Sequence, residues 1–283
     1  MKSTKKIISI DKLRSFENHP YKVQDNEEME ALAESIKVHG IVSPVIVRPF
    51  ENTADEYEII SGHRRVMASR KAGITEVPAL VVSLDRDAAA IVLVDSNLHR
   101  EHILPSEKAF AYKMKLDAMK HQGWRSDLTS NQLGGKLETA DLVGAETGDS
   151  KNQVRRYIRL TNLIPEILQY VDDGRISFTP AVELSYLNEQ EQQDLLEQIE
   201  QSDCTPSLSQ ACRFKKISQG EGLTPEVIAE IMEEEKANQK ERVKIPTEKL
   251  RKYFPKNYTV QQIEDEIIKL CEKNYRMKQR DAR

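Results

Sequence analysis

The sequence predicts an α+β domain at the N-terminus, an all-α domain that contains a helix-turn-helix, and a short helical segment at the C-terminus. Short apolar runs of the kind that form strands occur only before residue 103, and helical periodicity takes over after Pro105. A polar, glycine-containing break at residues 218–222 precedes the last segment. A chain of 283 residues has room for two or three domains. The expected domains are residues 1–103, residues 104–217 with the helix-turn-helix at 139–160, and residues 218–283.

Strand-like and helical stretches alternate in the first domain. The apolar runs at residues 57–60 and 77–82 predict strands, whereas residues 27–39, 66–73 and 88–94 predict helices. Beyond Pro105, which suits an early helical position, only helices are expected. They cover residues 105–122, 130–137, 139–147, 151–160, 165–171, 179–187 and 259–278. Residues 123–129, which include the single Trp124, look like an insertion between two of them.

A four-residue turn, Gly62-His63-Arg64-Arg65, lies between a predicted strand and a predicted helix. A glycine at this junction lets the backbone approach a ligand closely. The free N–H groups at the start of the helix then favour an anion, and arginine side chains can bind phosphate oxygens in pairs. These features describe a phosphate cradle. The alternative is an ordinary basic helix start whose arginines are solvated.

A second polar cluster follows the predicted helix at residues 88–94. If the helix continues, Asn97, Arg100 and Glu101 share one face, because positions three and four apart are neighbours. An amide, a guanidinium and a carboxylate at this place could read a base and hold a phosphate or a metal-bound triphosphate. A plain surface ladder of ion pairs has the same spacing.

Residues 139–160 have the pattern of a helix-turn-helix. Gly148 supplies the tight turn, and Asp149-Ser150 caps the next helix. Gly144 and Val154 occupy the positions where two steeply crossing helices need a small residue and a buried apolar one. The second helix offers side chains that suit base edges and phosphates. The candidate DNA-binding residues are Ser150, Lys151, Asn152, Gln153, Arg155 and Arg156. A helical hairpin with a charged outer face is the alternative.

The charge distribution permits nucleic-acid binding although the formal net charge is -4. Basic residues gather at 151–159, 213–216 and 269–283, and local patches rather than the total charge determine phosphate contact. No apolar run approaches the roughly 20 residues of a membrane span, so no membrane association is expected. Three well-separated cysteines indicate neither a disulfide nor a zinc site. The expected compartment is a reducing cytoplasm.

Residues 7–105 resemble the N-terminal domain of the ParB/Noc family of partition proteins. That family carries Gly-Glu-Arg-Arg before a small-residue helix and then Glu-Asn-x-x-Arg-Glu, in this order and with similar spacing. Residues 18–23, 27–39 and 40–49 also resemble its first conserved segment. The resemblance implies a site for CTP with Mg²⁺. The residues it points to are Gly62, His63, Arg64, Arg65, Asn97, Arg100 and Glu101.

Two positions depart from the family pattern. His63 stands where the family usually has Glu, and Ser96 stands where it has the Glu that precedes Asn. Both changes remove a carboxylate, which weakens the hold on Mg²⁺ because this ion prefers hard oxygen ligands. We expect CTP binding with weak or absent hydrolysis. Sulfiredoxins share the N-terminal fold but need a cysteine in the phosphate turn, so a thiol enzyme is not expected.

The resemblance also implies partners. Its members recognise palindromic centromere-like DNA sites and dimerise through a C-terminal domain, so a homodimer is expected. The apolar stripe Ile263, Ile267 and Leu270 is a candidate dimer seam. A small helical cap on the core is the equal alternative. A ParA-type ATPase stays open as a partner, since the flexible basic peptide that stimulates it in the family is not evident here.

The sequence thus predicts a nucleoid-associated, site-specific DNA-binding protein that acts as a CTP-gated clamp in plasmid or chromosome segregation. One alternative is a transcriptional regulator of a mobile element that keeps the helix-turn-helix but has a vestigial pocket. Another is a nucleotide-hydrolysing or phosphotransfer enzyme built on the N-terminal fold, which lacks an obvious general base.

Overall fold

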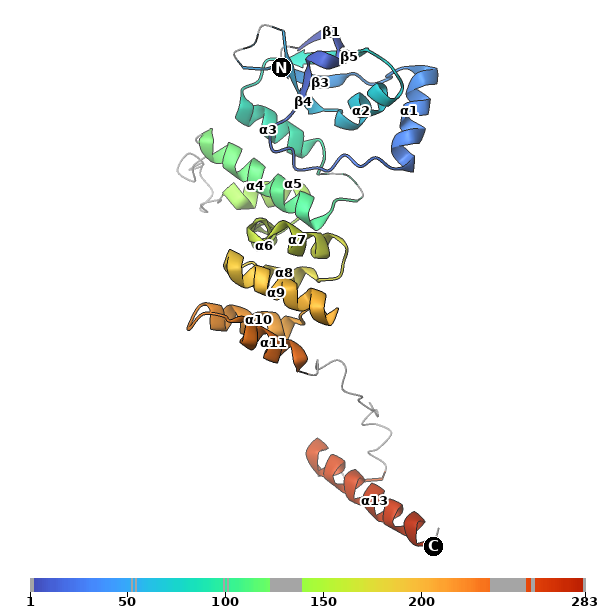
Figure 1. Cartoon of the computed structure of the whole chain (residues 1–283), viewed down its shortest axis with the longest axis vertical. Coiled ribbons are helices and arrows are strands. Elements are labelled where there is room, and N and C mark those ends of the chain that lie inside the picture. The colour runs from blue at the N-terminus through green and yellow to red at the C-terminus, as the bar shows by residue number, and fades with distance from the viewer. Residues whose placement is uncertain are drawn as a thin grey trace. The chain divides into compact units, whose positions relative to one another are not determined.

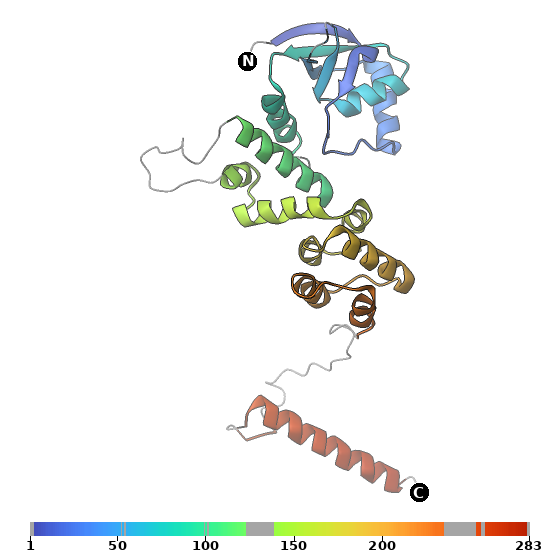
Figure 2. The same ribbon diagram turned by 60° about the vertical axis from the view of Figure 1, so that its left-hand side comes forward.

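The computed structural model describes residues 3–51, 53, 55–98, 100, 102–122, 139–234, 253–255 and 258–281. The chain divides into two compact units, residues 1–233 and residues 234–283 (Figures 1 and 2). The expected helix at 130–137 and the expected insertion around Trp124 lie outside the described residues. No helix in the described part of the chain is long and apolar enough to cross a membrane.

The first unit begins with a five-stranded mixed sheet, ordered β1-β5-β3-β4-β2. The strands are β1 (Ser3–Ser9), β2 (Leu13–Ser15), β3 (Val45–Pro49), β4 (Tyr57–Ser61) and β5 (Glu76–Val82). β1 pairs with β5 and β3 with β4 in antiparallel orientation, whereas β3–β5 and β2–β4 are parallel. The strands expected at residues 57–60 and 77–82 are therefore confirmed.

Helices cover both faces of this sheet. Because successive strand residues point to opposite faces, Ile59 and Ile60 of β4 enter different cores. Ile59 packs in the cluster that includes Val66 of α2 (His63–Lys71), and α2 lies against α1 (Glu27–His39). On the other face Ile60 packs with α3 (Arg86–Asp95) and α4 (Pro105–His121). The N-terminus of α2 is thus fixed at the end of a buried strand.

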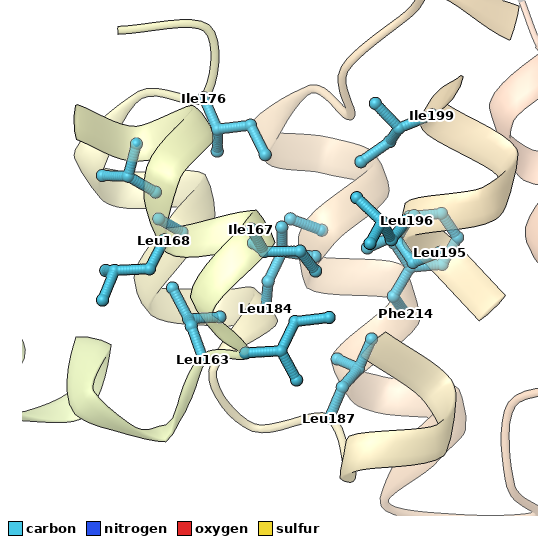
Figure 3. Packing of buried hydrophobic residues seen from close by; sticks show 14 of the residues in the cluster. Leu163, Ile167, Leu168, Ile176, Leu184, Leu187, Leu195, Leu196, Ile199 and Phe214 are labelled. Atoms are coloured by element: carbon cyan, nitrogen blue, oxygen red, sulfur yellow. The ribbon is translucent and has the colours of Figure 1, made fainter. Parts of the chain in front are cut away.

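The rest of the first unit is helical, and its helices stack in layers next to α3 and α4 (Figures 1 and 2). After α4 come α5 (Thr139–Thr147), α6 (Lys151–Arg159), α7 (Pro165–Asp172), α8 (Phe178–Leu184), α9 (Glu189–Ser202), α10 (Leu208–Ser218) and α11 (Pro225–Glu233). One buried apolar cluster joins α7, α8, α9 and α10, with Ile167, Leu184, Leu195 and Phe214 at its centre (Figure 3). In the residues that the structure describes beyond Pro105, the expected all-α architecture is confirmed.

Buried polar contacts fix α4 between the two parts of this unit. The Glu107 carboxylate, which is mostly buried, accepts the backbone N–H of Lys22 at 2.7 Å and that of Leu104 at 3.1 Å. Asp172 at the end of α7 accepts the Ser106 hydroxyl at 2.6 Å and forms an ion pair with Lys22 at 3.0 Å. The start of α4 is therefore held by both the sheet domain and the helical layers.

The second unit contains α13 (Val260–Asp281), which corresponds to the helix expected at residues 259–278. Ile263 of the expected apolar stripe is buried, whereas Leu270 is 55% exposed. Part of the stripe is therefore open to a partner, and the assignment of this helix to a dimer seam stays a prediction.

Glu191 connects α9 to the loop between α10 and α11. This buried carboxylate accepts the Asn188 N–H at 2.9 Å, the Ser218 hydroxyl at 2.7 Å and the Leu223 N–H at 3.0 Å. Removing it would leave the buried Leu223 N–H without an acceptor, which is costly. The contacts explain why the compact unit extends to Glu233 rather than ending near residue 218.

We expect Glu191→Ala to lower the free energy of unfolding by about 1–3 kcal/mol, because the buried Leu223 N–H loses its acceptor and two partly buried hydrogen bonds are lost with it. Denaturant titration measures the loss, and hydrogen exchange should show faster opening of α11. The control is Glu197→Ala, an exposed position on the same helix, which should change stability by about 0.5 kcal/mol or less. Equal stability of the two variants would contradict this role for Glu191.

Candidate functional site

The turn before α2 requires glycine. Gly62 has φ +106°, a conformation that L side chains rarely adopt. A Cβ atom at this position would also lie 2.8 Å from Val45 Cγ1. Among the described residues no side chain caps the start of α2, so its first N–H groups face outward as an anion site requires. The expected strand–turn–helix geometry is therefore confirmed.

The two arginines of the turn point to different partners. Arg64 forms an ion pair with Glu28 of α1 at 2.9 Å, and both side chains are exposed. Arg65 instead donates to the backbone carbonyls of Ser43 and Pro44, the latter at 2.8 Å, and burial lowers its pKa. Arg64 can therefore exchange its partner for an anion, whereas Arg65 holds the loop before β3.

His63 contacts a second histidine, His19, which lies far from it in the sequence. The rings of His63 and His19 lie 3.9 Å apart between centroids. His19 Nδ1 donates to the Tyr21 carbonyl at 2.7 Å, since a carbonyl can only accept. Burial, with further contributions from His19 and Arg100, lowers the pKa of His63 to about 3. The pair is consequently neutral at pH 7.

The expected helical face of Asn97, Arg100 and Glu101 is wrong, because α3 ends at Asp95. The Ser96 hydroxyl donates to the Leu93 carbonyl at 2.9 Å, and the Asn97 amide donates to the same carbonyl at 2.7 Å. Such local side-chain bonds compete with continuation of a helix. The chain turns at this point instead, and Glu101 lies outside the described residues.

This turn still brings Arg100, one of the predicted site residues, toward the turn at Gly62. The Arg100 guanidinium lies over the Tyr21 ring at 5.3 Å and acts electrostatically on both His19 and His63. Asn97 is 5% exposed, and its amide is used at the end of α3. Arg100 therefore influences His63 electrostatically. The Asn97 amide nitrogen instead stabilises the turn at the end of α3.

Mg²⁺, which the family resemblance implies, finds no protein cage in the described residues. No group of three or more His, Cys, Asp or Glu side chains there could hold a metal ion. His19 and His63 offer nitrogen, whereas Mg²⁺ prefers oxygen ligands. Glu28 is the carboxylate that Arg64 brings to the turn. The ion would therefore depend on phosphate and water oxygens.

The second predicted site has the geometry of a helix-turn-helix. A Cβ at Gly144 would lie 2.3 Å from the Asp149 carbonyl oxygen, so α5 and the turn approach too closely for any other residue. Gly148 has φ +75°, and Val154 is fully buried. The Ser150 hydroxyl accepts the Gln153 N–H at 3.2 Å as an N-cap. The roles predicted for Gly144, Gly148, Ser150 and Val154 in folding are confirmed.

Helix α4 supports this turn from behind. Tyr112 is fully buried; its hydroxyl donates to the Asp149 carboxylate and lies 2.8 Å from the Thr147 hydroxyl, with which it shares a hydrogen bond. Lys108 forms an ion pair with Asp149 at 2.7 Å. Burial alone would raise the pKa of Asp149, but hydrogen bonds from Lys108 and Tyr112 outweigh it and hold this pKa below its usual value. The turn is thus anchored to α4 by charge.

The outer face of α6 carries the candidate DNA-binding side chains. Asn152 and Arg155 are exposed, and Lys151 and Gln153 are partly exposed. Arg156 differs, because its guanidinium donates to Thr179 at 3.0 Å and lies over the Phe178 ring at 4.9 Å. Helix α8 therefore fixes the direction of Arg156, while Asn152 and Arg155 are exposed.

The supporting residues that sequence reasoning missed are His19, Glu28, Tyr112 and Asp172. Each acts on a residue far away in the chain, such as His63 or Ser106. Asp149 was identified only as part of a cap. No local pattern signals these contacts, because they arise from tertiary packing.

Two family models match the chain. Residues 1–98 match the ParB N-terminal domain, and residues 132–207 match the ParB HTH domain. These ranges contain the strand–turn–helix at Gly62 and the helix pair around Gly148.

Curated relatives show the same likeness. The nucleoid occlusion protein of Listeria innocua is 31% identical over 196 residues, which cover 69% of this chain and 62% of that protein. A probable chromosome 1-partitioning protein ParB of Deinococcus radiodurans is 34% identical over 175 residues, covering 62% and 53%. The chain thus spans about three fifths or less of the length of these relatives.

Solved structures give weaker likenesses. C-terminally truncated ParB from Caulobacter crescentus complexed to the centromeric parS site is 22% identical with a TM-score of 0.42, covering 80% of this chain and 98% of that one. The same protein complexed with CTP-gamma-S is 26% identical with a TM-score of 0.33, covering 69% and 98%.

The two family models in series, together with the observed sheet and helix-turn-helix, place this chain in the ParB family.

Proposed function

We propose that this chain is a site-specific DNA-binding partition protein in which α6 reads duplex DNA. The observation that carries the proposal is the α5–α6 geometry, whose second helix presents Asn152, Gln153 and Arg155 on an accessible face. Asn and Gln suit adenine edges, and Arg and Lys suit guanine or phosphates. The match to the ParB HTH domain over the same residues supports it. A palindromic site and a homodimer, with α13 as one possible seam, belong to the same proposal.

The N-terminal domain binds CTP in this proposal. The open N-terminus of α2, the glycine turn and the cations Arg64 and Arg100 provide an environment for a triphosphate. His63, which is neutral, would lie beside the anion without repelling it. A charged glutamate buried at the same position would repel it. Arg65 would act indirectly by fixing the loop before β3. Bound CTP would supply the charge that draws these groups together.

Helix α4 would couple the two sites. Buried Lys115 forms an ion pair with Asp95, beside the turn that carries Arg100, while Tyr112 and Lys108 hold Asp149 in the helix-turn-helix. Helix α4 therefore contacts both the end of α3 and the helix-turn-helix directly. A clamp gated by CTP around DNA uses this connection. The alternative function, a transcriptional regulator with a vestigial pocket, predicts no nucleotide binding. Measuring CTP binding therefore distinguishes it from the clamp.

Base-reading and phosphate-binding side chains on α6 should respond differently to alanine substitution. Asn152→Ala, Gln153→Ala or Arg156→Ala should cost about 1–3 kcal/mol on the selected site and relax specificity at one base pair. Lys151→Ala and Arg155→Ala should weaken binding to all sequences and lower the salt slope by about one unit. Duplex selection followed by titration at several salt concentrations measures both, with Lys37→Gln on α1 as control. Unchanged affinity and slope in all five variants would exclude DNA reading by α6.

The Arg64–Glu28 ion pair should compete with nucleotide. We expect Arg64→Gln to weaken CTP binding roughly 10- to 100-fold, as loss of a charge-assisted hydrogen bond implies. Glu28→Gln should strengthen binding, because it frees the guanidinium. Calorimetry measures both, and Glu34→Gln, another exposed carboxylate of α1 that pairs with Lys37, is the matched control. Short-duplex binding should be nearly intact in Arg64→Gln; equal loss of both activities in a folded protein contradicts the two-site account.

CTP turnover should be slow or absent even when CTP binds, because His63 and Ser96 replace carboxylates that would assist Mg²⁺. Phosphate release is measured with Mg²⁺, with and without the selected duplex. Brisk turnover stimulated by DNA would contradict this expectation and would direct attention to Glu101 as the residue that organises the metal.

A further inference from the structure

A basic groove runs along α6 and includes residues beyond the candidate DNA-binding positions. Its cavity of about 470 Å³ lies between α4, α6 and α8. The groove is defined by Lys113, Arg155, Arg156, Arg159, Asn162 and Tyr186. None of the described residues that line it is acidic. Four cationic side chains therefore border one concave surface without a carboxylate among its lining residues.

The groove continues the candidate DNA-reading face. Arg155, Arg159 and Asn162 are spaced by four and three residues, so they lie on one side of α6 and its continuation. Asn152 precedes Arg155 by three residues on the same side. A duplex that meets Asn152 would therefore pass the mouth of the groove as it follows the helix.

Arg159 is fixed in position before any ligand arrives. Its Nε donates to the Ser185 hydroxyl at 3.2 Å, and its Nη2 donates to the Ser185 carbonyl at 2.6 Å. The guanidinium also lies over the Tyr186 ring at 3.8 Å. A guanidinium held in this way loses little conformational freedom on binding a phosphate.

Lys113 supplies a cation from the opposite wall. It is exposed on α4, and no hydrogen bond or ion pair joins it to any residue that the structure describes. Its neighbours on the same helix differ, because Lys108 pairs with Asp149 and Lys115 pairs with Asp95. Lys113 thus contributes positive charge to the groove, and none of the described carboxylates forms an ion pair with it.

We propose that this groove holds the phosphate backbone of duplex DNA next to the bases read from the N-terminal half of α6, with Lys113 and Arg159 as phosphate-binding residues. The inference rests on the proposed DNA-binding function and extends its footprint to α4 and α8. Cations on both walls fit a polyanion that passes through the groove. Contacts of this kind position the protein and are blind to sequence.

The test compares Lys113→Gln with Lys120→Gln, an exposed lysine of α4 that does not line the groove. Lys113→Gln should weaken binding to selected and unrelated duplexes alike, by about two- to fivefold. It should lower the salt slope by about one unit and leave the ratio of the two affinities unchanged. Lys120→Gln should change neither quantity. Arg159→Gln should resemble Lys113→Gln, and a thermal melt shows whether it remains folded.

Three results would overturn the proposal. The first is an unchanged salt slope in Lys113→Gln while Asn152→Ala still loses specificity. This result would exclude the groove as a phosphate-binding surface but leave the proposed DNA reading by α6 intact. The second is a loss of inorganic phosphate or CTP binding in Lys113→Gln with unchanged duplex binding, which assigns the groove to a small anion. The third is the absence of duplex binding by the unmodified protein, which removes the proposed function as well.

Discussion

The arrangement of both sites depends on α4 being buried from several sides. Ala109, Ala111, Tyr112, Lys115 and Met119 all lie inside the protein, in contact with the sheet domain, the helix-turn-helix or the helical layers. Lys115 shows the constraint most clearly. It is 1% exposed and pairs at 2.5 Å with Asp95, whose side chain is partly exposed, so the ion pair joins the interior of α4 to the end of α3. The position of the turn that carries Arg100 follows from this pair.

The same helix explains how two modest sites can act together. Arg100 faces the neutral His19–His63 pair on the sheet side, and Asp149 is fixed by Tyr112 and Lys108 on the helical side. Among the described residues no cluster of His, Cys, Asp or Glu could hold a metal ion at either site. In the proposed function these two sites bind a triphosphate and a DNA backbone, and α4 is the element that contacts both.

Local chemistry made the larger part of the fold predictable. The helix-turn-helix was identified from Gly144, Gly148 and Val154, because steric demands of a tight turn act within a few residues. The continuation of the helix through Asn97 and Arg100 was wrong, since Ser96 and Asn97 bind the Leu93 carbonyl in a way that periodicity does not reveal. The partners of His63 and Asp149 could not be inferred, because tertiary packing alone brings His19 and Tyr112 to them.

The most direct test of the coupling through α4 is the dissociation constant of CTP with and without a saturating selected duplex. A coupling free energy of about 1–3 kcal/mol, the usual range for linked sites, would change this constant by about 5- to 150-fold. The ratio should fall toward one in Asp95→Asn, which weakens the contact to Lys115 while leaving α6 untouched. An equal dissociation constant of CTP with and without duplex, in a protein that binds both ligands, would contradict coupling through α4.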